Sequence, residues 1–176
     1  MGIGRFVKGA SLVWLLLLGF CFLGTGSAQA QNFTGPEAKV WEALQKFKQY
    51  GSQGSPQAGL YLSKRSYEIL TQLLLTQAMA QGSITAAEAE QNRESLTAEL
   101  QRPDSPLAKD LWKHMAQLTG DLEYDNPAIS IAPGGQEATI YERDNPSEAL
   151  KFFNEGGWKL GLFESVTDMM GTLQNR

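Results

Sequence analysis

Apolar side chains recur every three or four residues in several segments between residues 34 and 120, a period that predicts amphipathic α-helices. In the first segment, Val40, Trp41, Leu44 and Phe47 share one side of the expected helix. The second segment has the widest apolar arc and is expected to be the most buried, whereas the third is mostly Ala, Glu and Gln and is expected to face solvent. The predicted helices cover 34–50, 66–80, 85–101 and 105–119.

Capping residues mark where three of these helices begin. Thr34 is followed three residues later by Glu37, and Thr85 by Glu88, the spacing of a capping box in which each side chain bonds the other residue's backbone N–H. Ser105 precedes a proline and is expected to cap the last of the four helices.

After residue 121 the hydrophobic period changes to two, which predicts β-strands with one apolar face. Glycine- and proline-containing turns separate these segments and predict an antiparallel meander. The expected strands lie around 129–131, 138–141, 150–152 and 158–162, and a short helix is expected at 164–173. Such a sheet must bury its apolar face, so we expect an α+β fold with the N-terminal helices packed on one face of a curved antiparallel sheet of about four strands.

The first thirty residues have the pattern of a cleavable secretory signal rather than of a folded segment. Arg5 and Lys8 precede an apolar stretch at 12–23, and small residues at Ala28 and Ala30 fit signal peptidase. We therefore predict cleavage after Ala30, Sec-dependent export to a periplasm or an equivalent extracytoplasmic compartment, and a single mature domain at 31–176.

Two alternatives to cleavage after Ala30 remain open. Cys21 could be the lipid-bearing residue of a lipoprotein signal, although Phe20 stands where that motif has a small residue. The apolar stretch could also persist as a membrane anchor; no later segment approaches the length of a membrane span. Cys21 is the one cysteine, so a mature chain that begins at Gln31 forms no disulfide.

The charge balance argues against two classes of partner. The chain has 15 basic and 19 acidic residues, and 1–30 hold two of the basic ones and none of the acidic ones, so the mature net charge is −6. An acidic domain without a basic stripe is poorly suited to bind nucleic acid or an anionic membrane surface.

The segment 150–160 (LKFFNEGGWKL) resembles the closing hairpin of the nuclear-transport-factor-2-like superfamily, also called the SnoaL-like or cystatin-like cone fold. The segment 45–66 is similar to the opening of secreted members. Two helical segments, 85–101 and 105–119, depart from the simplest members of that superfamily. The resemblance implies a pocket between the helices and the curved sheet, which different members use for catalysis, ligand binding or association.

His114 is the chain's one histidine, which excludes a metal site or mechanism that needs two. Asp110 lies four residues earlier on the same helix face, so the pair could act as a general base with its orienting carboxylate. A surface pair without function is the alternative interpretation. Three alternating acids, Asp121, Glu123 and Asp125, could bind a hard cation or be solvated loop residues. We assign no metal and no cofactor.

Four aromatic residues could line a pocket for a flat apolar ligand, because each offers a stacking face and a polar edge: Trp112, Tyr124, Tyr141 and Trp158. The alternative is that Trp158 belongs to the core and the tyrosines to the surface of the sheet.

These features leave three functional hypotheses. The first is an exported, non-enzymatic module that binds a small apolar ligand or an envelope protein. The second is a small cone-fold enzyme that uses Asp110 and His114 as acid and base. The third is an associative role as a homodimer, through the sheet face that carries Tyr141 and Phe153.

Overall fold

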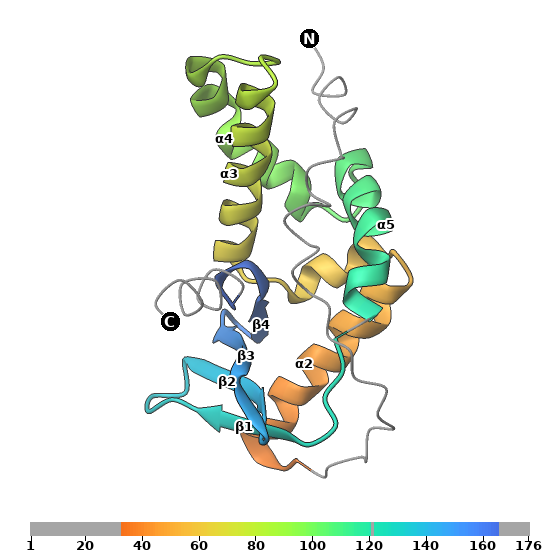
Figure 1. Cartoon of the computed structure of the whole chain (residues 1–176), viewed down its shortest axis with the longest axis vertical. Helices are drawn as coiled ribbons and strands as arrows, with labels where there is room; N and C mark the ends of the chain where they lie inside the picture. The colour runs from red at the N-terminus through yellow and green to blue at the C-terminus, as the bar shows by residue number, and fades with distance from the viewer. Residues whose placement is uncertain (1–32, 121, 166–176) are drawn as a thin grey trace.

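The computed structural model describes residues 33–120 and 122–165. In this part of the chain the helices come first: α2 (Gly35–Ser52), the 3₁₀ helix η2 (Pro56–Tyr61), α3 (Lys64–Ala80), α4 (Ala86–Gln101) and α5 (Pro106–Gly120). The strands follow: β1 (Pro127–Ile131), β2 (Glu137–Glu142), β3 (Asn145–Asn154) and β4 (Trp158–Gly161). The sheet and α2 lie at one end of the molecule, and α3 and α4 form a helical hairpin that extends to the other (Figure 1).

The strands form one antiparallel sheet in the order β1-β2-β3-β4, which confirms the predicted meander and the α+β class. Its register places apolar residues opposite one another on a single face. Ile140 of β2 lies between Ile129 of β1 and Leu150 of β3, and Phe152 pairs with Leu160 of β4. This alternation is the period of two that the sequence carries.

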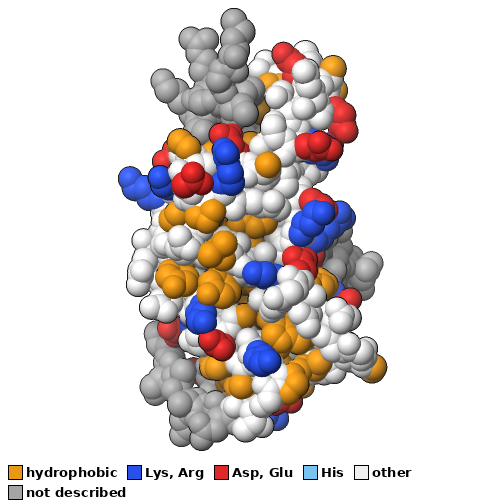
Figure 2. Space-filling model, turned by 180° about the vertical axis from the view of Figure 1, so that it is seen from behind, with side chains coloured by type: hydrophobic (Ala, Val, Ile, Leu, Met, Phe, Trp, Pro, Cys, Tyr) orange, Lys and Arg blue, Asp and Glu red, His pale blue; other side chains and the backbone are white. Residues whose placement is uncertain are grey.

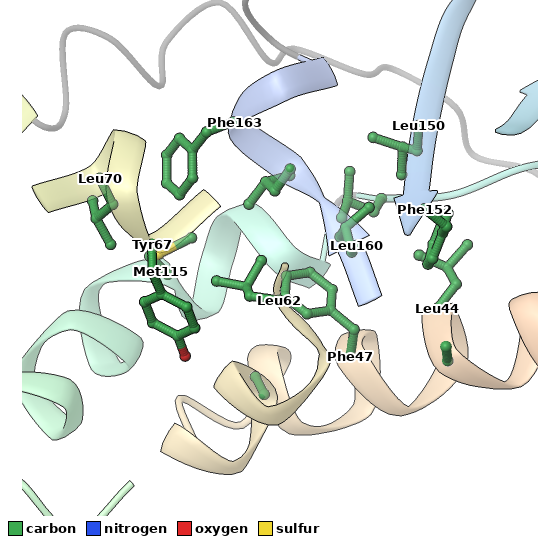
Figure 3. Close-up of a cluster of buried hydrophobic side chains, with 14 of the residues drawn as sticks. Leu44, Phe47, Leu62, Tyr67, Leu70, Met115, Leu150, Phe152, Leu160 and Phe163 are labelled. Atoms are coloured by element: carbon green, nitrogen blue, oxygen red, sulfur yellow. The ribbon is translucent and has the colours of Figure 1, made fainter. Parts of the chain in front are cut away.

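Helix α2 covers this apolar face. Val40, Leu44 and Phe47, one helical turn apart, have no exposed surface, and neither have Phe152 and Leu160 of the sheet. The close-up in Figure 3 shows side chains from α2, the sheet and the helical hairpin meeting in a single cluster. The core is therefore a helix-on-sheet layer, as the fold class requires.

The start of α3 joins the helical part to the sheet. Leu62 makes a parallel bridge to Leu160, and the N–H of Ser63 donates to the Leu160 carbonyl at 2.9 Å. Two carboxylates from the end of the chain then bind the N-terminus of α3. Glu155 accepts from the N–H of Lys64 at 3.0 Å, and Glu164 accepts from the hydroxyls of Ser63 and Ser66. Negative charge at a helix N-terminus is favourable because it offsets the helix dipole.

The two predicted capping boxes have different outcomes. Thr85 and Glu88 form the complete box, with the Thr85 N–H donating to the Glu88 carboxylate at 2.8 Å and the Glu88 N–H donating to the Thr85 hydroxyl at 3.3 Å. The box predicted at Thr34 is wrong: its side chain makes no capping hydrogen bond. Gly35 has a φ of 59°, outside the helical region, so the first turn of α2 does not have the regular geometry that a capping box needs.

This difference predicts different costs for the same substitution at the two helix starts. Thr85→Ala is expected to lower the free energy of unfolding by about 1 kcal/mol, because it removes a formed N-cap. Thr34→Ala, the matched control, is expected to change it by less than about 0.5 kcal/mol. Urea denaturation followed by circular dichroism measures both, and equal costs would contradict the structure.

Helix α3 leaves part of its wide apolar arc exposed. Leu73 is 37% exposed, and Ile69 and Leu74 are half-buried. The reason lies in the tertiary arrangement, since α3 extends away from the sheet beside α4 and leaves part of its surface uncovered (Figure 1).

The predicted signal at 1–30 and most of the predicted terminal helix lie outside the described residues; the chain is helical from 162 to 165. Among the described helices, none combines the length and the hydropathy that a membrane crossing requires.

Candidate functional site

Trp112 lies in the interior with no exposed surface, between α5 and α2. Its indole ring meets the ring of Phe47 edge-on, with the centroids 5.7 Å apart. Its Nε1–H is buried and has no hydrogen-bond partner among the described residues. An indole nitrogen can only donate, so this group needs an acceptor that residues 33–120 and 122–165 do not provide.

Two other residues approach the same indole edge. Gly59, in η2, lies so close that a Cβ atom on it would be 3.2 Å from Trp112 Nε1 and would overlap the Tyr67 hydroxyl oxygen. The backbone of Gly59 is not in the left-handed region, so lack of space is what excludes a side chain here. Tyr67 extends from α3 with its hydroxyl directed away from Leu70 and Phe163 (Figure 3). We call Gly59, Tyr67 and Trp112 the interior polar site.

Burial determines the electrostatics of this site. Tyr67 is 4% exposed, and burial raises the pKa of its phenol far above the ordinary value. Neither a charge nor a hydrogen bond contributes to that shift. The phenol is therefore protonated at neutral pH, and the site presents two neutral hydrogen-bond donors close together.

A second buried polar atom without a partner is Glu99 Oε2. It belongs to a carboxylate that is partly exposed and whose other oxygen lies 4.0 Å from Arg102. That charge is therefore balanced at the surface, and we do not include it in the site.

Asp110 and His114, the acid–base candidates, both lie on the exposed side of α5. The ring nitrogen Nδ1 of His114 lies 2.7 Å from the backbone carbonyl oxygen of Asp110, an interaction along the helix. Trp112, by contrast, faces inward from the same helix. The structure therefore places the histidine and the interior polar site on different sides of α5.

The four aromatic candidates do not occupy equivalent positions. Trp112 is fully buried, whereas Tyr124, Tyr141 and Trp158 are half-buried. Trp158 and Tyr124 pack against the edge of the core. Tyr141 lies in β2 between Ala128 of β1 and Ala149 of β3. Because it directly follows Ile140, its side chain lies on the other face of the sheet from the apolar one.

The alternating acids lie in an irregular segment before β1 rather than on a strand, and Asp121 itself is outside the described residues. Glu123 is exposed. Burial lowers the pKa of Lys48 in α2, and the negative charge of Glu123 opposes that shift. Within 33–120 and 122–165, no group of three acidic, histidine or cysteine side chains could hold a metal ion.

Hydrophobic side chains also reach the surface, interspersed with lysine and arginine (Figure 2). Beside the interior site, Leu60 of η2 is 48% exposed. The rings of Tyr50 and Tyr61 stack with centroids 6.1 Å apart, and the Lys159 ammonium lies over Tyr61 at 5.9 Å. Lys159 also donates to the Leu60 carbonyl, so it holds η2 from the outside.

No family model, curated protein or solved structure matches this chain. The resemblance to the nuclear-transport-factor-2-like superfamily therefore stays a prediction.

Sequence reasoning selected Trp112 but missed Tyr67 and Gly59 as its neighbours. Tyr67 fits the apolar stripe of α3, and Gly59 lies in a stretch without hydrophobic period. A glycine beside apolar residues in a short turn was the available signal, yet the sequence does not say which side chains approach it.

Proposed function

We propose that this protein is an exported, non-enzymatic binding module of the envelope that holds one small, largely apolar molecule at the interior polar site. The buried indole N–H of Trp112, which has no acceptor in the part of the chain that the structure describes, carries the proposal. Leaving such a group unpaired costs about 1–3 kcal/mol, and a bound ligand with an acceptor atom would recover that energy. The predicted signal at 1–30 supports the export part of the proposal.

Binding fits this site better than acid–base catalysis does. Tyr67 is the titratable residue of the three, and burial keeps its phenol protonated at neutral pH. A general base must exchange protons near the operating pH and lie within reach of the substrate. His114, the acid–base candidate from the sequence, lies on the exposed side of α5, away from this site.

The ligand would enter by displacement of η2. Gly59 closes the site from this side, and a 3₁₀ helix has weaker hydrogen-bond geometry than an α-helix. The helix η2 spans six residues. Tyr61 stacks on Tyr50 of α2, and Lys159 contacts Leu60 and Tyr61 from the outside.

Association is the second candidate, and the exposure of Leu60 beside the Tyr50–Tyr61 stack favours it. In this case the apolar surface of η2, rather than the interior, would meet a second copy of the chain. Ligand binding and association predict different native masses: one chain with a small molecule for the first, two chains for the second.

Native mass spectrometry of the mature protein, purified after export, tests the proposal. We expect the native mass to exceed the denatured mass by one small organic molecule, and Trp112→Phe to lose it. Phenylalanine keeps an aromatic ring in the core but removes the N–H donor. The denatured mass also tests whether the chain begins at Gln31.

Trp41→Phe is the matched control. Trp41 is half-buried on α2 and its ring lies 5.4 Å from that of Phe33, so this variant is expected to retain the ligand. A native mass equal to one bare chain would contradict ligand binding, as would retention of the ligand by Trp112→Phe. A mass of two bare chains would favour association instead.

A further inference from the structure

The two edges of the sheet differ in how they are covered. At the β4 edge, Leu62 makes a parallel bridge to Leu160, so the segment before α3 protects that strand. The opposite edge is β1, and no strand within 33–120 and 122–165 pairs with its outer side. β1 is the outermost strand, at the end of the molecule away from the α3–α4 hairpin (Figure 1). An uncovered strand edge is a template for pairing with another chain.

The hydrogen bonds between β1 and β2 determine which backbone groups point outward. The N–H of Ala132 donates to the Glu137 carbonyl at 2.9 Å, which makes these two residues a hydrogen-bonded pair of the antiparallel ladder. Such pairs alternate with non-hydrogen-bonded ones, so Ser130 also bonds to β2, whereas Ile129 and Ile131 do not. The N–H and C=O groups of Ile129 and Ile131 therefore point away from β2, toward the open edge.

β1 lacks the features that usually keep an edge strand from pairing. Its sequence, PAISI, contains no charged residue. Its one proline, Pro127, stands at the first position, so the rest of the strand can still donate hydrogen bonds. On the face that α2 covers, the side chains of Ile129 and Ile131 are only half-buried. A neighbouring strand would thus find both hydrogen-bonding groups and apolar surface at this edge.

We infer that two copies of this chain associate through β1, antiparallel and centred on Ser130, so that their two sheets become one. In this arrangement Ile129 of each copy lies opposite Ile131 of the other, and each pair exchanges both of its N–H···O=C bonds. Pro127, which has no N–H to donate, falls outside the pairing.

A second copy fits this edge for two further reasons. Each Ile129–Ile131 pair joins two half-buried β-branched side chains on the same face, a favourable cross-strand contact. The pairing is also isologous, because the same strand serves both copies. Since Leu62 covers the β4 edge, the assembly closes at two chains instead of growing into a fibre.

The association is separate from ligand binding at the interior polar site. An edge of five residues makes a contact of the small, transient class, so we expect the dimer to be populated at about 1 mM and dissociated at about 10 μM. Native mass spectrometry at low micromolar concentration therefore records the single chain. Its result for the ligand does not depend on β1.

Charge variants at Ser130 test the pairing. Ser130 is exposed on the other face of β1, and in the dimer the two Ser130 side chains lie directly opposite in a non-hydrogen-bonded pair, where side chains are closest. Ser130→Lys and Ser130→Glu are each expected to weaken dimerisation at least about fivefold, because like charges then face each other. An equimolar mixture of the two variants is expected to restore it, since a lysine then faces a glutamate. Sedimentation velocity over this concentration range at low salt, where charges are least screened, measures all of them.

Ser95→Lys is the matched control, because Ser95 is exposed on α4, and it is expected to leave dimerisation unchanged. Circular dichroism checks that each variant keeps its fold. A monomer at about 1 mM would overturn the inference, as would unchanged dimerisation of Ser130→Lys. Failure of the mixture to recover would overturn the pairing centred on Ser130. Loss of the dimer in Leu60→Ser would place the association at η2 instead.

Discussion

Gly59→Ala is expected to lower the free energy of unfolding by about 1–3 kcal/mol, the usual cost of overpacking a core. The added Cβ would overlap the Tyr67 hydroxyl oxygen and lie 3.2 Å from Trp112 Nε1. The backbone conformation at Gly59 is one that alanine can adopt, so the effect is one of space. Urea denaturation measures this cost.

A double-mutant cycle with Tyr67→Phe identifies the source of that cost. Removing the hydroxyl leaves the ring carbon Cζ, which would be 3.5 Å from the new Cβ, an ordinary contact distance. The alanine is therefore expected to cost at least about 1 kcal/mol less in the Tyr67→Phe background than in the natural sequence, a coupling typical of residues in contact. Additive costs would show that the hydroxyl does not lie beside Gly59.

Phe152→Ala is expected to have the largest effect on stability, about 3–5 kcal/mol, because it removes a large side chain from the core. Phe152 has no exposed surface and lies in β3 opposite Leu160, on the face that α2 covers. Much of the free energy of a domain this size would be lost, so we expect the variant to unfold near or below physiological temperature.

The neighbouring residue supplies the control for this prediction. Phe153 is half-buried on the other face of β3, and its ring lies over Gly161, where a Cβ would be 2.5 Å from the Phe153 ring. Phe153→Ala is expected to cost about 1–2 kcal/mol, since it uncovers less surface. Thermal unfolding of both variants provides the test, and a larger cost at Phe153 would reverse the assignment of the two faces.

The costs of these two phenylalanines could be ordered from the sequence alone, because the alternation in 150–160 already placed Phe152 with Leu150 and Leu160. The same is true of the meander, of the cap at Ser105, whose hydroxyl accepts from the Ala108 N–H at 3.0 Å, and of the box at Thr85. These features depend on residues close together in the chain, so the periodicity and the capping spacing predict them.

Where two segments carried the same sequence signal, the structure decided whether the predicted feature forms. Thr34 and Thr85 have equivalent spacings to a glutamate, but only Thr85 forms its box, since Gly35 begins α2 with a φ of 59°. Leu73 belongs to the widest apolar arc in the sequence, yet it is 37% exposed because α3 extends beyond the core beside α4.

The sequence by itself determined the α+β class, the order of the elements and the apolar faces, because these follow from hydrophobic period and turn chemistry within short segments. Tertiary structure alone brought Gly59, Tyr67 and Trp112 together from η2, α3 and α5. The physical reason is that a periodic pattern says which side chains are buried, whereas the packing of separate elements decides which buried atoms meet and which donor is left without an acceptor.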